Sequence, residues 1–178
     1  MVTGGSGSGK SEFAEDIAVQ FGFPLYYIAT MHVADAESED RVRRHRMQRE
    51  GKGFQTVECP VKLEEMQFEK EGATVLLEDL SNLLANEMYL PEGRMKMETG
   101  GALSNRLKDV ILNPIFKLAE EVGHLVIVSN EVFSDGIEYD AETMRYIRLL
   151  ATLNRELAKA ADGVVEVVCG IPLWRKRR

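Results

Sequence analysis

The sequence predicts a three-layer α/β fold with a mainly parallel central sheet, and three observations support this prediction. Short apolar runs alternate along the whole chain with longer stretches of helical periodicity. The first apolar run leads directly into a glycine-rich loop that ends in Lys10 and Ser11. Hydrophobic residues make up 44% of the 178 positions, which is enough for residues 1–178 to fold as a single domain around one core.

The opening strand is expected to be very short, because only three residues precede the loop. The loop fits the phosphate-binding pattern G-x-x-x-x-G-K-[ST] at Gly4, Gly5, Ser6, Gly7, Ser8, Gly9, Lys10 and Ser11. Its glycines let backbone N–H groups turn inward around phosphates, where side chains would obstruct them. We expect Lys10 to reach the β- and γ-phosphates of a nucleoside triphosphate and the Ser11 hydroxyl to hold Mg²⁺. A Gly/Ser linker is the alternative, but a linker would not place Lys-Ser at the start of the amphipathic helix predicted for residues 12–18.

The elements that follow alternate between strand and helix. We predict strands at residues 25–29, 54–57, 73–77, 124–129 and 164–168. We predict helical sequence at residues 36–50, 81–90, 103–122 and 141–161, the third stretch being interrupted or kinked at Pro114. Residues 93–101 are polar and Met-rich and indicate a mobile loop. The basic end of the chain, residues 175–178, is expected to be a frayed, solvated terminus.

Charge and cysteine usage exclude several classes of protein. Twenty-nine acids against 22 bases give a net charge of −7, which argues against nucleic-acid or anionic-membrane partners. Cys59 and Cys169 lack CxxC spacing, so neither a zinc site nor a disulfide framework is indicated. No apolar run approaches the roughly 20 residues that span a bilayer, and no signal peptide opens the chain. We therefore expect a soluble cytoplasmic protein.

Acidic and amide side chains follow two of the predicted strands. Glu78 and Asp79 come directly after the strand at 73–77, which we expect to lie beside the first strand. One of these acids would then lie close to the Mg²⁺, bound directly or through a water molecule. The alternative is that these acids follow the strand without any role in metal binding, and the spacing leaves both interpretations open. Asn130 and Glu131 stand just past the strand at 124–129, where open α/β sheets place functional groups.

A basic stripe is formed by Arg41, His45 and Arg49, which are spaced by four residues and therefore share one face of a helix. Guanidinium groups bind phosphates bidentately, and a neutral histidine beside a bound phosphate can attack phosphorus. The alternative is a solvated basic helix face with an incidental histidine, which the spacing alone favours. His124 opens a predicted strand and indicates a structural role, and Asn154, inside a predicted helix, indicates packing or capping.

Taken in order, these pieces resemble one family, the bifunctional adenosylcobinamide kinase / adenosylcobinamide-phosphate guanylyltransferases of cobalamin biosynthesis. Order and spacing match over nearly the whole chain. The matching stretches are GGSGSGKSEFAE from Gly4, YYIAT from Tyr26, RVRRHRMQR from Arg41, FQTVE from Phe54, LLEDLSNLLAN from Leu76, VIVSNEV from Val126 and LNRELAKAADGVVEVVCGIPL from Leu153. The resemblance implies a P-loop NTPase-like domain of the RecA-like type and a homo-oligomer, expected to be a trimer.

The resemblance also implies two reactions. A nucleoside triphosphate, GTP or ATP, would phosphorylate the aminopropanol hydroxyl of adenosylcobinamide. GTP would then guanylylate a histidine, and the GMP would pass to the phosphorylated corrinoid with loss of pyrophosphate. The residues that match the family's histidine, its arginines, its acid and its Asn-Glu pair are His45, Arg41, Arg49, Glu78, Asn130 and Glu131. The resemblance therefore favours a functional role for the basic stripe over a solvated helix face. The expected catalytic residues are Lys10, Glu78 and His45, and Ser11 and Glu78 are expected to hold Mg²⁺.

The chain departs from the family pattern in two loops. Gly7 stands where the family usually has an arginine, and residues 133–136 replace a glycine-rich G-x-G stretch with a longer one that begins with an aromatic ring. Because these loops should shape the corrinoid and nucleobase pockets, a guanylyltransferase or a kinase with only one activity stays open as an alternative. A GTP-dependent switch that binds a protein partner, without small-molecule chemistry, also stays open.

Overall fold

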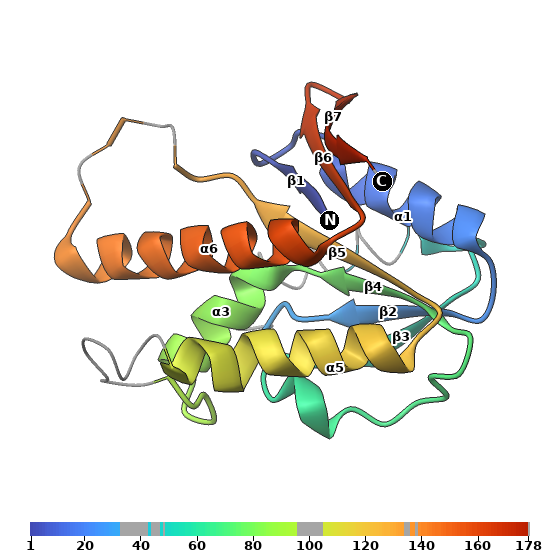
Figure 1. Cartoon of the computed structure of the whole chain (residues 1–178), viewed down its shortest axis with the longest axis horizontal. Helices are drawn as coiled ribbons and strands as arrows, with labels where there is room; N and C mark the ends of the chain where they lie inside the picture. Colours follow the sequence, from blue (N-terminus) through green and yellow to red (C-terminus); the bar gives the residue numbers. More distant parts are fainter. Residues whose placement is uncertain are drawn as a thin grey trace.

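One sheet of seven strands forms the centre of a computed structural model, which describes residues 1–32, 43, 47, 49–95, 105–133, 136–137 and 139–177 (Figure 1). The strand order is β3-β2-β4-β5-β1-β6-β7. The strands are β1 (Val2–Gly4), β2 (Leu25–Ala29), β3 (Phe54–Glu58), β4 (Thr74–Glu78), β5 (His124–Asn130), β6 (Gly163–Val168) and β7 (Ile171–Arg177). All neighbouring strands are parallel except β6 and β7. The predicted mainly parallel sheet is confirmed.

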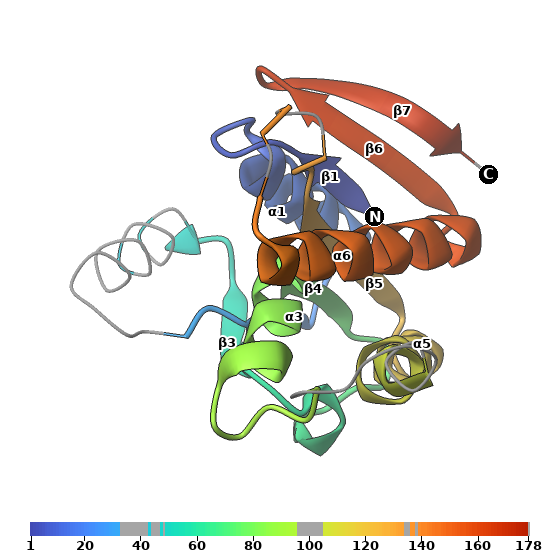
Figure 2. The same cartoon turned by 90° about the vertical axis from the view of Figure 1, so that its left-hand side faces the viewer.

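Helices cover both faces of the sheet and complete the three layers (Figures 1 and 2). The helices are α1 (Lys10–Phe21), α3 (Leu80–Tyr89), α5 (Asn113–Glu121) and α6 (Ala141–Ala160), with a 3₁₀ turn η1 (Leu63–Glu65) and a π-helix η2 (Lys108–Leu112). On one face, α1 packs Ala14 and Ala18 against the sheet. On the other face, α3, α5 and α6 enclose a larger core with Leu77 and Ile127. Alternate residues of β2, β4 and β5 enter opposite cores, as the pleat requires.

β5 lies between β1 and β4, so the strand that ends at Glu78 is not a neighbour of the first strand. The prediction that these two strands lie side by side was wrong. Strand order is set by the crossover connections, about which a local apolar pattern carries no information. The acid still lies near the loop because α1 packs across β4 as well as β5. The register also places Gly4 beside Asn130, which brings the carboxyl ends of β1 and β5 together.

The helix predicted for residues 103–122 is divided near Pro114, as expected. Residues 105–107 are helical, η2 follows, and α5 takes Pro114 in its first turn. Pro114 has no N–H to donate to an earlier carbonyl, and it lies where the backbone changes from π-helical to α-helical geometry. The helical stretch predicted at 36–50 and the loop predicted at 93–101 fall mainly outside the described residues.

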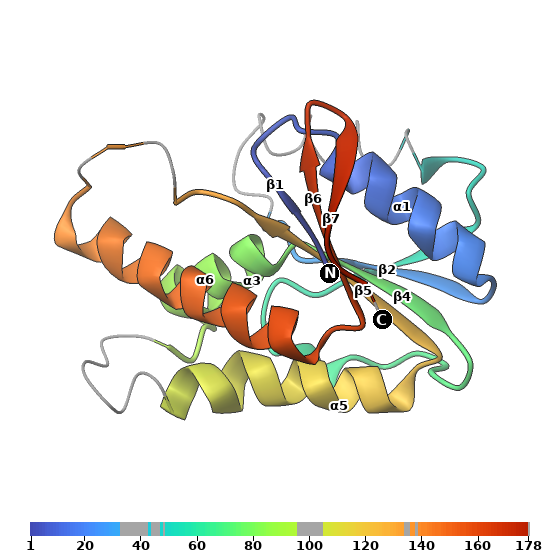
Figure 3. The ribbon, with the colours of Figure 1, turned by 45° about the horizontal axis from the view of Figure 1, so that its top comes forward.

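The basic end of the chain is a strand, and the prediction of a frayed terminus was wrong for the described residues up to 177. β7 pairs antiparallel with β6 and forms the edge of the sheet (Figure 3). The Arg175 guanidinium is paired with Glu166, and Lys176 Nζ donates to two backbone carbonyls at the end of α6. Arg177 lies over the ring of Trp174, 4.4 Å from its centroid. These partners on β6, on α6 and within β7 explain why so basic a segment is ordered.

Candidate functional site

The glycine-rich loop joins β1 to α1 and leaves no room for side chains at its base. A Cβ atom at Gly4 would lie 2.5 Å from Ser8 Oγ and from the Val167 carbonyl oxygen, so only glycine fits. Gly9, at φ 88°, caps α1 in the left-handed conformation that glycine adopts without strain. The Lys10 ammonium is buried and reaches back across the loop to donate to the Gly5 carbonyl oxygen at 3.2 Å. The loop is therefore a compact ring of backbone with one cation held against it.

Ser11 and Glu78 meet beside this loop. The Ser11 hydroxyl lies close enough to the Glu78 carboxyl group to act on its pKa, and Glu78 Oε2 is buried and has no hydrogen-bond partner among the described residues. Burial raises the pKa of Glu78 to about 7, although the nearby Ser11 hydroxyl acts in the opposite direction. The negative charges of Asp79 and Glu15 raise the same pKa further, and Arg49 lowers it. A buried carboxylate oxygen that lacks a donor is well suited to a cation.

A hydroxyl and a carboxylate are hard oxygen donors of the kind that Mg²⁺ prefers, so Ser11 and Glu78 fit this ion. Among the described residues there is no group of three or more His, Cys, Asp or Glu side chains that could hold a metal. An ion at this place would thus take its remaining ligands from phosphate and water, which is how Mg²⁺ commonly binds with nucleotides.

Asp79 has a different role from Glu78. It caps the N-terminus of α3, where its carboxylate accepts from the Asn82 N–H at 2.7 Å and from Ser81 Oγ at 2.5 Å. It also accepts from Asn130 Nδ2 at 3.3 Å. The sequence left Glu78 and Asp79 open as alternatives for the metal, and this geometry engages Asp79 in the helix cap and leaves Glu78 facing the loop.

Asn130 and Glu131 lie beside the loop, but their side chains are partly engaged within the protein. Asn130 Nδ2 donates to Ser81 Oγ as well as to Asp79, and Glu131 Oε1 accepts from the Phe133 N–H at 2.9 Å. The Glu131 backbone N–H donates to the Gly4 carbonyl oxygen at 3.0 Å. Asn154 donates to the Asn130 carbonyl and accepts from Ser129 Oγ, as expected of a packing residue. Nucleotide binding by Asn130 and Glu131 stays a prediction.

The basic stripe is only partly described. Arg41 and His45 lie outside the described residues, and their predicted roles stay predictions. Arg49 is described, and it is buried with its guanidinium over the ring of Tyr27. The charge of Arg49 acts on Glu78, so the last member of the stripe lies close to the Ser11–Glu78 pair.

Two buried polar residues of this region were missed by the sequence analysis. Thr30 Oγ1 donates to the Asp79 carbonyl oxygen at 2.8 Å and accepts from the Asp79 N–H at 2.7 Å. Asn86 Nδ2 donates to the carbonyl oxygens of Thr30 at 2.7 Å and Pro60 at 2.9 Å. A single Thr or Asn has no periodicity that marks it as functional, so no sequence signal could have found either without knowledge of the strand order.

The comparison with known families decides the assignment. A family profile described as cobinamide kinase / cobinamide phosphate guanyltransferase matches residues 1–174. The chain belongs to this family. The match contains the glycine-rich loop, Glu78, the basic stripe and the Asn130–Glu131 pair, and it confirms the resemblance inferred from the sequence.

Curated relatives of this family match over almost their full length. The bifunctional adenosylcobalamin biosynthesis protein CobP of Pseudomonas aeruginosa is 27% identical over 174 residues, covering 97% of this chain and 94% of the relative. The proteins named CobU from Salmonella typhimurium and Escherichia coli are each 31% identical and cover 96% of this chain and 96% of their own. A solved structure, the P4 protein from bacteriophage phi6 in complex with ADP, has a TM-score of 0.39 and 15% identity, with 96% of this chain and 50% of that chain covered. This chain spans half of the P4 chain, and a likeness at this level supports no functional conclusion.

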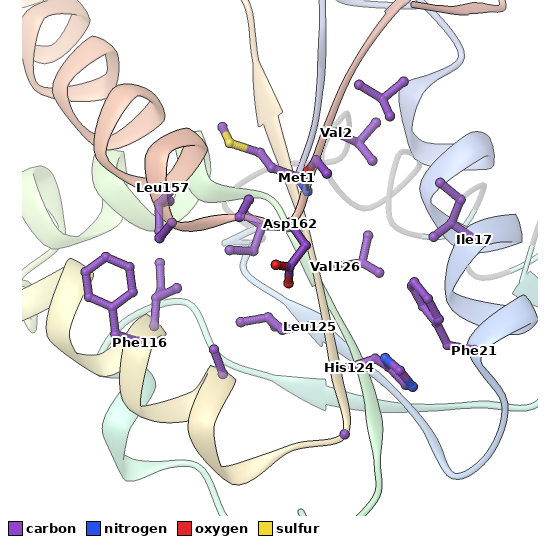
Figure 4. A pocket seen from close by; sticks show the side chains of 18 of the residues that line it. Met1, Val2, Ile17, Phe21, Phe116, His124, Leu125, Val126, Leu157 and Asp162 are labelled. Carbon is purple, nitrogen blue, oxygen red and sulfur yellow. Dashed lines mark hydrogen bonds between the residues drawn. The ribbon is translucent and has the colours of Figure 1, made fainter. Parts of the chain in front are cut away.

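This member of the cobinamide kinase / guanyltransferase family also carries a pocket far from the loop. It has a volume of about 320 Å³ and lies at the amino ends of β1, β5 and β6, between α1 and α5 (Figure 4). His124 lines it and stacks on Phe21, with ring centroids 4.3 Å apart. The structural role predicted for His124 agrees with this stacking, since parallel α/β sheets bind ligands at the opposite, carboxyl ends of their strands.

No helix in the described part of the chain is long and apolar enough to cross a membrane.

Proposed function

We propose that this chain is a bifunctional transferase that phosphorylates adenosylcobinamide and then transfers GMP from GTP to adenosylcobinamide phosphate, giving adenosylcobinamide-GDP. The observation that carries the proposal is the family match over residues 1–174, on a chain whose loop holds Lys10 against the Gly5 carbonyl and has Ser11 beside Glu78. Names of relatives that contain the word bifunctional support two activities on one chain. An enzyme that depends on nucleoside triphosphates is also expected to work in the cytoplasm.

In the first transfer, the substrate hydroxyl oxygen attacks the γ-phosphorus of GTP or ATP. The bond from that phosphorus to the bridging oxygen breaks, the nucleoside diphosphate leaves and the hydroxyl proton is lost. Lys10 and the loop N–H groups would bind the β- and γ-phosphates and keep them in position during this transfer. Ser11 and Glu78 would hold Mg²⁺, which, when bound, offsets the charge on the phosphate oxygens.

In the second transfer, a ring nitrogen of His45 attacks the α-phosphorus of GTP and pyrophosphate leaves. A phosphate oxygen of the corrinoid then attacks the same phosphorus, and the P–N bond breaks to free the histidine. Arg41 and Arg49 would bind phosphate oxygens and stabilise the charge that develops there. A histidine intermediate suits this reaction because it splits one difficult displacement into two easier ones.

Intact-mass spectrometry after incubation with Mg²⁺ and GTP tests the proposal. The wild-type chain should gain the mass of one GMP, and a His45→Ala variant should gain none. Corrinoid phosphorylation, measured separately with ATP and with GTP, should persist in His45→Ala and disappear in Lys10→Ala. Mass gain without corrinoid phosphorylation would support the enzyme with guanylyltransferase activity alone, and absence of both reactions would refute the proposal.

We also propose that the chain forms a homo-oligomer, expected to be a trimer, through the β6–β7 edge. Apolar side chains there are open to solvent, among them Ile171 at 62% and Trp174 at 44% exposure, and β7 has pairing partners on one side only. Sedimentation of the wild-type chain beside an Ile171→Asp variant tests this. A monomeric wild-type chain would refute it.

A further inference from the structure

Arg49 is compensated by an aromatic ring. Its guanidinium carbon lies 3.4 Å from the centroid of the Tyr27 ring. Arg49 is 7% exposed and Tyr27 is 5% exposed, so both groups are removed from water. Burying a guanidinium is costly unless something offsets the loss of hydration, and the face of a phenol ring does so through its quadrupole. Yet Arg49 Nη1 is buried and has no hydrogen-bond partner among the described residues.

Two of the three carboxylates around Tyr27 are engaged elsewhere. Glu15 accepts from Lys52 Nζ at 2.8 Å and Asp79 caps α3, while Glu78 lies beside Ser11 and its Oε2 has no hydrogen-bond donor among the described residues. All three nevertheless act on the ring, because burial and then their negative charges raise the pKa of the Tyr27 phenol above its usual value, while Arg49 lowers it. The charge of Arg49 thus acts on both Tyr27 and Glu78, while its Nη1 is left without an acceptor in the described structure.

The ring is itself fixed in place. Tyr27 is in the middle of β2 and shares the α1 face with Leu25 and Ala29. Ala29 pairs with Glu78, so the ring lies about two residues, or roughly 7 Å, from the Ser11–Glu78 pair along the strand direction. The edge of the ring packs against Phe54 on β3, with centroids 6.3 Å apart and planes at 80°. Arg49 therefore lies on a rigid aromatic platform.

A ring offsets the charge of a guanidinium in a way that a carboxylate cannot. A carboxylate would take up N–H donors at the edge of the guanidinium, and it would compete with phosphate for them. A ring interacts with the flat face and leaves the edge donors available. We propose that Tyr27 is a positioning residue that holds Arg49 so that Nη1 donates to a phosphate oxygen of the bound nucleoside triphosphate. This inference rests on the proposed function, and it adds a residue that acts through Arg49 and does not touch the reacting atoms.

Calorimetric binding of Mg·GTP tests the inference, with every variant made in the His45→Ala background so that no guanylylation occurs. Tyr27→Phe keeps the ring and should bind within about twofold of its parent. Tyr27→Leu removes the ring and should weaken binding about tenfold. The affinity of Tyr27→Leu for inorganic tripolyphosphate with Mg²⁺ should fall by a similar factor relative to its parent, because the loss of the ring affects contacts with the phosphates. Tyr27→Met serves as a second ring-free variant if Tyr27→Leu does not fold.

Tyr26→Leu is the matched control. Tyr26 is the preceding residue of β2 and is equally buried, but it enters the opposite core, where its ring packs against Phe68. This variant should lower the melting temperature about as much as Tyr27→Leu and leave Mg·GTP affinity unchanged. Equal affinity in Tyr27→Leu and its parent, or equal losses in the two leucine variants, would overturn the inference alone. A parent that does not bind Mg·GTP would overturn the proposed function with it.

Discussion

Thr30 and Asp79 are joined by two hydrogen bonds between one hydroxyl group and one residue's backbone. Thr30 Oγ1 donates to the Asp79 carbonyl oxygen at 2.8 Å and accepts from the Asp79 N–H at 2.7 Å. The Thr30 N–H also donates to the Glu78 carbonyl oxygen at 3.1 Å. The backbone that follows the Glu78 Cα is therefore tied to the end of β2, and we infer that this attachment directs the Glu78 side chain toward Ser11.

Thr30→Val should remove both hydroxyl hydrogen bonds while keeping the shape of the side chain. We expect a loss of about 2 kcal/mol in the free energy of unfolding, because two buried backbone groups lose a partner. Guanylylation should slow, since Glu78 is no longer held. Urea unfolding and the rate of GMP-mass gain measure the two effects, and Thr30→Ser should restore most of both.

Thr74→Val is the matched control for this change. Thr74 is also a fully buried threonine at a strand end, but its Oγ1 has no hydrogen-bond partner in the described structure. Replacing that hydroxyl by a methyl group should leave stability unchanged or raise it. A loss in Thr74→Val as large as in Thr30→Val would show that the hydrogen bonds to Asp79 are not the cause.

Glu78→Gln should stabilise the chain without nucleotide at neutral pH. Burial raises the pKa of Glu78 to about 7 from its usual 4.5, so the folded state resists ionisation that the unfolded chain allows. This carboxyl therefore lowers stability progressively as pH rises from about 4.5 to about 7, by up to roughly 3 kcal/mol. Glutamine does not ionise, so the advantage of the variant should be absent near pH 4 and largest above pH 7.

Urea unfolding of the wild-type chain and of Glu78→Gln between pH 4 and pH 8 measures how the stability difference changes with pH. If the two unfolding free energies change with pH in parallel, the ionisation of Glu78 does not affect stability as expected. The same variant should bind Mg·GTP more weakly than the wild-type chain. A variant that is more stable but binds Mg·GTP more weakly is expected if the buried Glu78 carboxylate serves to bind a cation.

The sequence predicted the layers and most element ends because these depend on local patterns. Apolar runs bounded by glycine or polar residues marked β2, β4 and β5, and Pro114 marked the change of helical geometry between η2 and α5. The position of β5 between β1 and β4 depends on crossovers, which no local pattern encodes. The strand β7 was missed because its stability comes from partners such as Glu166, which cannot be seen before the pairing is known.

The candidate site shows the same division. The sequence predicted that Ser11 and an acid after the strand at 73–77 would lie near one Mg²⁺. The reason given, that this strand lies beside the first, was wrong, but the structure places Glu78 beside Ser11. The buried attachments Thr30 and Asn86 could not be predicted, since each joins segments far apart in the sequence. Arg49 was predicted from its spacing, but its position over Tyr27 depends on the fold.

Asn86→Ala should loosen both ends of the segment that carries the basic stripe. The Asn86 amide donates to Thr30 at the end of β2 and to Pro60 just after β3, and Arg41, His45 and Arg49 lie between these two points in the sequence. Two buried carbonyl oxygens would lose their donor, at a cost of about 2–3 kcal/mol in unfolding free energy. Guanylylation should fall more than corrinoid phosphorylation, because the loosened segment holds His45.

Asn82→Ala is a suitable control on the same helix. Asn82 Nδ2 makes one hydrogen bond of 3.2 Å to Asp79, so its loss should cost at most about 1 kcal/mol. It should also reduce the two activities equally. If Asn86→Ala lowers both activities by the same factor, the amide stabilises the fold without positioning the stripe.

Gly4→Ala should lower the free energy of unfolding of the chain even in the absence of nucleotide. An added Cβ would lie 2.5 Å from the Val167 carbonyl oxygen, which is backbone of β6 and cannot move aside as a side chain can. β1 and β6 would have to separate, and we expect a loss of about 3 kcal/mol by urea unfolding. Gly5→Ala is the matched control, because its Cβ would meet nothing within 4 Å. That variant should keep its unfolding free energy within about 0.5 kcal/mol, so any loss of nucleotide affinity in it reports on phosphate contact alone. Equal destabilisation by the two alanines would mean that the contact with Val167 does not limit the size of residue 4.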